Sequence, residues 1–245
     1  MIDIHSHILP CRGDNGFSSI GDTFSMVLSA RSQGVTAMFA TPPSEAFFRE
    51  GEYIFRRFHT MKQMLRSVFP GMEFYLGSEI MLSASNMKHI IQALERGELP
   101  TMGGRYVLVE FHEAVQKPTV SFCLSRLIRA GYLPILAHWE CYVNLRDQLD
   151  YIRNLHQNGC LVQLNVFSPE TCRDESSRNW IRVLLREKLA DFLGTDCHKA
   201  WCRPSSIRQG LEWLIKTCED PEYAEAITWK NANERLIPKE EKTLC

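Results

Sequence analysis

The chain has 245 residues, with 28 lysines and arginines against 29 aspartates and glutamates, so its formal net charge is −1. This near-neutrality argues against a broad electrostatic contact with nucleic acid or an anionic membrane, and we expect neither partner. With 44% hydrophobic and 23% charged residues, the composition supports a large apolar core and excludes a disordered chain.

The chain carries no obvious membrane or export signal. No apolar run approaches the ~18 residues of a membrane-spanning helix, and the opening MIDIHSH contains an aspartate and two histidines, unlike a secretory signal. We therefore expect a cytoplasmic protein without membrane insertion. The nine cysteines are odd in number and include no C-x-x-C pair, which predicts reduced thiols rather than disulfides or a zinc ribbon.

Short apolar runs alternate with stretches of helical period, a pattern typical of a parallel sheet covered by helices. The expected strands are Met1–Ile4, Val35–Ala40, Glu73–Leu76, Tyr106–Val109, Leu133–Ala137, Leu161–Leu164 and Asp191–Gly194. The order predicts an α/β fold of seven β-then-α units. No linker or repeat divides the chain, and its length suits one α/β barrel, so we expect one domain over residues 1–245.

Helical periodicity is clearest in two of the stretches between the expected strands. One runs from Val120 to Ile128, and the other runs from Leu145 to Leu155. Gly34, Gly131 and Gly159 stand where three of the helices are expected to end.

Ionisable side chains stand at the ends of most of the predicted strands. They are His5, His7, Glu79, Glu110, His138, Asp196 and His198. Because the carboxyl ends of the strands in a parallel barrel open onto one face, we expect these side chains to converge. Imidazole and carboxylate ligands suit manganese, iron or zinc, and cations would offset the repulsion among the three acids. A metal site is therefore expected at this face.

Taken singly, each of these residues has an ordinary structural explanation. A histidine at a strand end is usually a hydrogen-bonded surface or core residue, and an acid there can cap the next helix. The combination of His-x-His, Asp-x-His, a further histidine and two strand-end glutamates favours the metal site. His59, His89 and His156 lie inside helical stretches and are interpreted as structural, whereas His112 fits either role.

At these positions the sequence resembles the polymerase and histidinol phosphatase (PHP) superfamily, and more closely the metal-dependent protein-tyrosine phosphatases of bacterial capsule and exopolysaccharide loci. The matching segments are MIDIHSHILP at 1–10, ATP at 40–42, GSEI at 77–80, LVEF at 108–111, PILAHWECY at 134–142, and TDCH at 195–198 followed by Arg203-Pro204. The resemblance implies a distorted TIM-like (β/α)7 barrel of the PHP type. It also implies a manganese-dependent protein-tyrosine phosphatase in the control of capsule or exopolysaccharide synthesis.

The resemblance also implies ligands for two or three divalent metal ions, which we expect to be manganese, with iron and zinc as alternatives. The implied sets are His5, His7, Glu79 and Asp196 for one ion, Glu79, Glu110 and His138 for a second, and Asp14 with His198 for a third. The implied substrate is a phosphotyrosyl protein, and the implied partner is a bacterial tyrosine kinase.

Two positions depart from the family pattern. Pro43 stands where the family has a histidine ligand of the third ion, and its ring offers no ligand atom; Glu45 is a candidate replacement. Cys141 stands where the family has an arginine. Arg203 is therefore expected to bind the phosphoryl group and, with His138, to act in catalysis.

Three alternative functions follow from the same residues. Cys197 and Arg203 match the C-x5-R spacing of cysteine-dependent phosphatases, but the five intervening residues lack glycine and the neighbouring Asp196 would raise the thiol pKa. A degenerate, non-catalytic PHP-type binding protein would explain Pro43 and Cys141. A PHP phosphatase for a small phosphate ester is the third alternative.

Overall fold

The structure is a computed structural model that describes residues 1–11, 19–166, 175–198 and 207–238. Its strands are β1 (Ile2–Ser6), β2 (Ala37–Ala40), β3 (Glu73–Leu76), β4 (Glu79–Met81), β5 (Tyr106–Glu110), β6 (Leu133–Leu136), β7 (Leu161–Asn165) and β8 (Phe192–Gly194). The larger helices are α1 (Ile20–Ser32), α2 (Ser44–Glu50), α3 (Glu52–Val68), α4 (Met87–Glu95), α5 (Lys117–Arg129), α6 (Leu149–Gln157), α7 (Glu175–Arg186) and α8 (Ile207–Cys218). Shorter elements are the 3-10 turn η1 (Trp139–Cys141), α9 (Pro221–Glu225), the π-helical turn η3 (Ala226–Lys230) and α10 (Asn231–Arg235).

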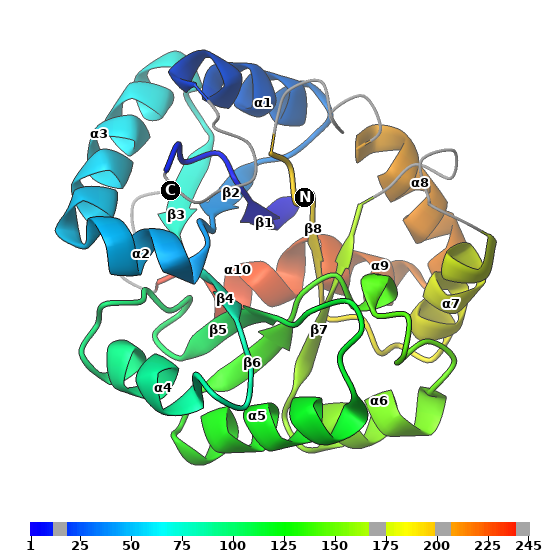
Figure 1. Ribbon diagram of the computed structural model, residues 1–245. Coiled ribbons are helices and arrows are strands. Elements are labelled where there is room, and N and C mark those ends of the chain that lie inside the picture. The colour runs from blue at the N-terminus through cyan, green and yellow to red at the C-terminus, as the bar shows by residue number, and fades with distance from the viewer. Residues whose placement is uncertain (12–18, 167–174, 199–206, 239–245) are drawn as a thin grey trace.

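The strands form two parallel sheets, with the orders β1-β2-β3 and β4-β5-β6-β7-β8. Isolated parallel bridges join the two sheets at both edges: Ser6 pairs with Cys197 after β8, and Pro43 after β2 pairs with Glu79 of β4. Helices α1 to α8 lie outside the strands, as Figure 1 shows. The predicted α/β fold with parallel strands is confirmed. Among the described residues, no helix has both the length and the apolar character needed to cross a membrane.

Each expected strand has a counterpart in the structure, which also contains an additional short strand, β4. The amide of Gly77 donates to the carbonyl oxygen of Ala40, and the amide of Glu79 donates to that of Pro42, so the chain continues alongside the segment after β2. A Cβ atom on Gly77 would lie 2.7 Å from the terminal methyl of Met102, so a larger residue at this bend would require the Met102 side chain to shift. Three residues are too few to show a period in the sequence, and β4 was therefore missed.

The helix positions agree less closely with the sequence pattern than the strand positions do. Gly34, Gly131 and Gly159 each have φ near +90° directly after a helix, as expected for helix ends. The expected helix from Leu145, however, begins only at Leu149. Leu145 is fully buried in the preceding segment, so its apolar character reflects core packing and not helical period.

The inward faces of the strands change from apolar to polar along their length. Phe39, Leu108, Ile135 and Phe192 belong to one buried cluster between the strands, which Ala232 of α10 also joins. Side chains two residues apart on a strand share a face, so Glu110 follows Leu108 on the inner side. The packed apolar layers therefore lie beneath a polar layer at the carboxyl ends of the strands.

A pH-dependent contact lies away from that polar layer. His156 Nε2 of α6 lies 3.0 Å from Asp191 Oδ2. The hydrogen bond to Asp191 raises the pKa of His156 above 6.5, against the effects of burial and Arg235, which lower it. A raised folded pKa means that this contact stabilises the protein fully below the unfolded pKa, and the effect is lost as pH rises through the folded value.

We therefore expect His156→Gln to destabilise the protein more at pH 6 than at pH 8.5. Urea unfolding of both proteins in the presence of a chelator measures the difference in unfolding free energy. A difference that stays constant or grows toward pH 8.5 would contradict this assignment.

Candidate metal centre

The structure brings together the seven ionisable residues found at the predicted strand ends. His5 lies in β1 and His7 follows it, Glu79 opens β4, and Glu110 ends β5. The others follow strands: His138 comes after β6, and Asp196 and His198 come after β8. Their side chains form three overlapping groups, and within each group the potential ligand atoms lie within 4.8 Å of one another.

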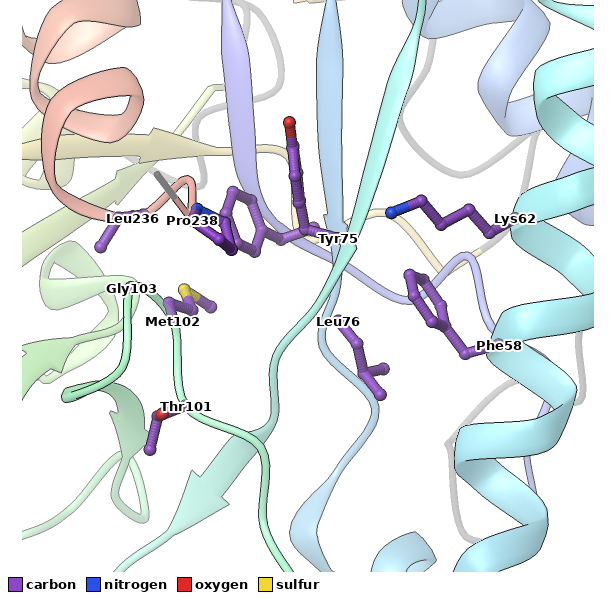
Figure 2. Close-up of a pocket in the computed structure, with 10 residues that line it drawn as sticks. Phe58, Lys62, Tyr75, Leu76, Thr101, Met102, Gly103, Leu236 and Pro238 are labelled. Carbon is purple, nitrogen blue, oxygen red and sulfur yellow. The ribbon is translucent and has the colours of Figure 1, made fainter. Parts of the chain in front are cut away.

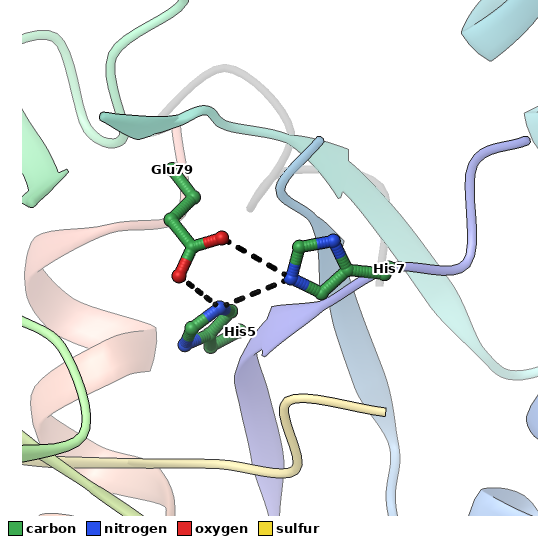
Figure 3. Close-up of side chains that lie close together, drawn as sticks. All are labelled: His5, His7 and Glu79. Atoms are coloured by element: carbon green, nitrogen blue, oxygen red, sulfur yellow. Dashed lines mark hydrogen bonds and ion pairs between the residues drawn. The ribbon is translucent and has the colours of Figure 1, made fainter. Parts of the chain in front are cut away.

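The first group consists of His5, His7 and Glu79, all buried (Figure 3). His5 Nε2 lies 3.0 Å from Glu79 Oε1, and His7 Nε2 lies 3.3 Å from Glu79 Oε2. The two Nε2 atoms are 3.4 Å apart. One carboxylate thus faces two imidazoles with both of its oxygens.

The second group shares Glu79 with the first. His138 Nε2 lies 3.4 Å from Glu79 Oε1 and 3.5 Å from Glu110 Oε2. Glu79 therefore belongs to both groups, and its carboxylate faces imidazoles of each.

The third group shares His7 with the first and adds Asp196 and His198. Asp196 Oδ1 lies 3.6 Å from His7 Nε2 and 3.5 Å from His198 Nδ1. The rings of His7 and His198 are stacked, with centroids 3.8 Å apart. All three groups together occupy one continuous polar layer.

Two of these residues have backbone conformations in the left-handed region. His138 has φ 34° and Asp196 has φ 49°, each just after its strand. Histidine and aspartate tolerate this region better than most residues, but such conformations still cost of order 1–3 kcal/mol and cluster at functional sites. The sharp turns direct the His138 side chain toward Glu79 and the Asp196 side chain toward His5 and His7.

Mutual electrostatics set the protonation of the cluster. Burial raises the pKa of Glu79, but His5, His138 and His7 outweigh it and hold that pKa well below its usual range. Burial lowers the pKa of His138, but Tyr142, Glu110 and Glu79 outweigh it and hold that pKa well above its usual range. These shifts favour a protonated His138 beside an ionised Glu79 when no cation is bound. A divalent cation would take the place of that proton.

Burial and a neighbouring acid act in the same direction on Glu110. Burial raises its pKa, and the charge of Glu79 raises it further. Three carboxylates and four imidazoles in one buried to half-buried layer form a donor set that suits a divalent transition metal. The residues present therefore fit a cluster of divalent ions.

A separate buried acid attaches β1 to the segment after β8. Asp3 accepts hydrogen bonds from the Thr195 hydroxyl at 2.6 Å, from the Thr195 amide at 2.9 Å and from the His5 amide at 3.2 Å. Burial raises the pKa of Asp3 to about 6, against these hydrogen bonds, which lower it. The contact sets the position of His5 relative to Asp196.

Sequence reasoning missed two polar residues beneath the site, Gln163 and Asn165 of β7. Both are buried, and they hydrogen-bond to each other and to His5, His138 and Asp196. Alternation from Leu161 places both on one face, so a polar pair at the end of an apolar strand was a usable signal.

Sequence reasoning also missed Glu140, a buried acid in η1. Its Oε1 accepts from the Asn165 amide at 3.0 Å. Burial raises the pKa of Glu140 to about 7, against hydrogen bonds and the His138 charge, which lower it.

Some predicted functional residues cannot be placed in the site. Asp14 and Arg203 lie outside the described residues. Glu45 is exposed on α2 and belongs to none of the three groups. His112 is also exposed and outside them. Cys197 is buried, and burial together with Asp3 raises its pKa to about 12, which disfavours a thiolate nucleophile.

The pocket shown in Figure 2 is separate from this layer. Its lining residues are Phe39, Phe58, Lys62, Tyr75, Leu76, Thr101, Met102, Gly103, Leu236 and Pro238. None of them belongs to the three groups, and the Lys62 ammonium lies 5.4 Å from the Tyr75 ring centroid. The mainly apolar lining offers no set of metal ligands.

Comparison with known proteins identifies the family. The model of the capsular polysaccharide synthesis family CpsB/CapC matches residues 1–237. The chain belongs to the CpsB/CapC family. Tyrosine-protein phosphatase CpsB of Streptococcus agalactiae is 25% identical over 224 residues, covering 88% of this chain and 90% of that protein. Tyrosine-protein phosphatase YwqE of Bacillus subtilis is 24% identical over 225 residues, covering 88% and 84%.

Solved structures extend the likeness to the fold. A structure from a study of the metal-dependent tyrosine phosphatases YwqE of Bacillus subtilis and CpsB of Streptococcus pneumoniae matches with a TM-score of 0.75 and 22% identity, covering 91% of this chain and 90% of that one. A histidinol phosphate phosphatase from Lactococcus lactis, in complex with zinc, matches with a TM-score of 0.56 and 14% identity, covering 89% and 93%. This CpsB/CapC member therefore shares its fold with metal-dependent hydrolases.

Close packing under the site generates a prediction at Gly194 of β8. A Cβ atom there would lie 2.6 Å from His5 Cβ and 3.0 Å from Gln163 Nε2. We expect Gly194→Ala to displace both side chains and to destabilise the protein by about 1–3 kcal/mol, measured by urea unfolding. Gly21→Ala is the control, because its Cβ would meet only Ser19 Oγ at 3.5 Å. Equal stability of the Gly194 variant and the native protein would contradict the close approach.

Proposed function

We propose that this CpsB/CapC protein is a metal-dependent protein-tyrosine phosphatase that hydrolyses phosphotyrosyl protein. The observation that carries the proposal is the sharing of Glu79 between two candidate ligand groups that contain His5, His7, Glu110 and His138. Two cations close together suit hydrolysis of a phosphate monoester, whose uncatalysed rate is among the slowest known. The names of the family's relatives support the phosphotyrosine substrate.

We further propose that the seven clustered residues are the metal ligands. In this assignment Glu79 bridges two ions, one also held by His5 and His7 and the other by Glu110 and His138. Asp196, whose Oδ1 lies 3.7 Å from His5 Nε2 and 3.6 Å from His7 Nε2, would complete the first set. His198 and Asp14 would serve a third ion, and Pro43 removes one family ligand from that third set, so occupancy by two ions is the simplest arrangement. Manganese is the proposed metal, and iron and zinc suit the same donors.

Bound cations would supply charge stabilisation for the phosphoryl oxygens in the transition state. The protein's contribution is to fix His138 and Asp196 by the turns that follow β6 and β8 and to keep Glu79 ionised. A tyrosyl leaving group has a pKa of about 10, so its departure needs little help from a general acid. Arg203 is proposed to bind the phosphoryl oxygens.

The wider biological setting follows from the family. We propose that the two bridged sheets form the distorted barrel typical of PHP proteins. The cytoplasmic location, the single domain over residues 1–245, and a bacterial tyrosine kinase as partner in capsule or exopolysaccharide synthesis stay predictions.

The first test is His138→Ala. We expect the rate of metal-dependent hydrolysis of a phosphotyrosyl peptide to fall roughly 100-fold or more with the fold retained. The reason is that the substitution removes one of the three proposed ligands in the group of Glu79, Glu110 and His138. His156→Ala is the matched control, since His156 lies outside the site, and it should keep the native rate. Full manganese-dependent turnover by the His138 variant would refute the assignment.

The second test separates metal from thiol chemistry. We expect a chelator to abolish hydrolysis and added manganese to restore it, whereas a thiol alkylating agent should have little effect because Cys197 is buried. The rate on phosphotyrosyl peptide and on small phosphate esters is measured under each condition. Inhibition by alkylation alone would favour the cysteine mechanism, and native protein inactive on every ester would favour the non-catalytic binding protein.

A further inference from the structure

We propose that Gln163 is a positioning residue that fixes the ring tautomer of His5, so that the Nε2 atom of His5 is the one presented to a metal ion. This inference rests on the metal centre of the proposed function. Its basis is a directional chain of hydrogen bonds that runs from His5 through Gln163 and Asn165 to Asp196.

The first step concerns the orientation of the Gln163 amide. Its Oε1 atom lies 3.0 Å from the backbone nitrogen of His138. A backbone N–H can only donate, so the Gln163 atom facing it must be the oxygen. The same oxygen lies 3.1 Å from His5 Nδ1. Because an oxygen acceptor faces it, His5 Nδ1 must carry the proton.

The opposite end of the chain fixes the same direction independently. Asn165 Nδ2 donates to Asp196 Oδ2 at 3.1 Å, and an ionised carboxylate can only accept. The Asn165 oxygen is therefore left to accept from Gln163 Nε2 at 2.9 Å. The backbone amide of His138 can only donate, and the Asp196 carboxylate can only accept. Together they fix the orientations of the Gln163 and Asn165 side-chain amides that lie between them.

The consequence falls on His5. With Nδ1 protonated, the lone pair of a neutral ring lies on Nε2. That atom lies 3.0 Å from Glu79 Oε1 and 3.4 Å from His7 Nε2, inside the first ligand group. Hydrogen bonds of this kind commonly set the orientation and basicity of a ligating histidine.

The burial of the hydrogen-bond chain makes its arrangement rigid. Gln163 is 0% exposed and Asn165 is 2% exposed. Gly194 lets Gln163 and His5 approach, since a Cβ atom at that position would contact both. Neither amide can find an alternative partner in water without opening the strands. Strand β7, which carries none of the proposed metal ligands, thereby links His5 of β1, His138 after β6 and Asp196 after β8.

The experiment measures metal affinity and the His5 tautomer in the full-length protein. Gln163→Met removes both hydrogen-bonding groups at similar volume, and we expect its dissociation constant for Mn²⁺, measured by calorimetry, to rise roughly 10–100-fold. Leu164→Met is the control on the same strand, with its side chain in the outer core, and its affinity should stay within about twofold of the native value. Long-range proton–nitrogen NMR of the native protein loaded with Zn²⁺ should show His5 protonated at Nδ1.

A second variant separates the two halves of the hydrogen-bond chain. Asn165→Leu leaves the Gln163 oxygen in place, so the Nδ1 proton of His5 should persist although Asp196 loses a donor. His5 protonated at Nε2 in the native protein, or a folded Gln163→Met protein with native affinity, would overturn the inference. If Gln163→Met does not fold, the His5 tautomer measured by NMR in the native protein is the deciding result. If the native protein binds neither Mn²⁺ nor Zn²⁺, the metal centre itself fails, which is a different result.

Discussion

The central constraint on this molecule is the gathering of three carboxylates, one buried and two half-buried, in one polar layer. Glu79, Glu110 and Asp196 would repel strongly in a water-poor layer without compensating positive charge. In the structure that charge resides on histidines, and the depressed pKa of Glu79 and the raised pKa of His138 reflect the same attraction. Such a layer is costly as a purely structural feature. Bound divalent cations would supply compensating positive charge to this layer.

The rest of the fold positions this layer. Apolar side chains fill the space between the strands, and the inward positions turn polar only toward the carboxyl ends. The contact of Asp3 with Thr195 joins the first strand to the segment after the last, and Gln163 links residues on both sides of β7. Most of these supports are buried and hydrogen-bonded, so the ligand atoms are held before any ion arrives. This preorganisation lowers the conformational cost of binding.

The two departures from the family pattern affect different parts of the chemistry. Pro43 stands directly before α2 and pairs with Glu79, so it serves the fold. Under the proposed function the ligand it replaces would belong to a third ion, and the two candidate groups that share Glu79 do not include this position. Cys141 offers no positive charge to a phosphoryl group, so the proposed function assigns phosphoryl binding to Arg203. The shared Glu79 groups, and not the third, are therefore the basis of the proposed activity.

The sequence by itself determined the alternation of strands and helices, the positions of Gly34, Gly131 and Gly159 at helix ends, and the seven ionisable side chains that converge. These follow from local period and from the rule that parallel strands point the same way. The tertiary structure decided the short strand β4, the later start of α6, and the sharing of His7 between two of the groups. It also decided the role of Gln163, because a buried amide is identified by its partners, and these lie 158 and 25 residues away in the chain.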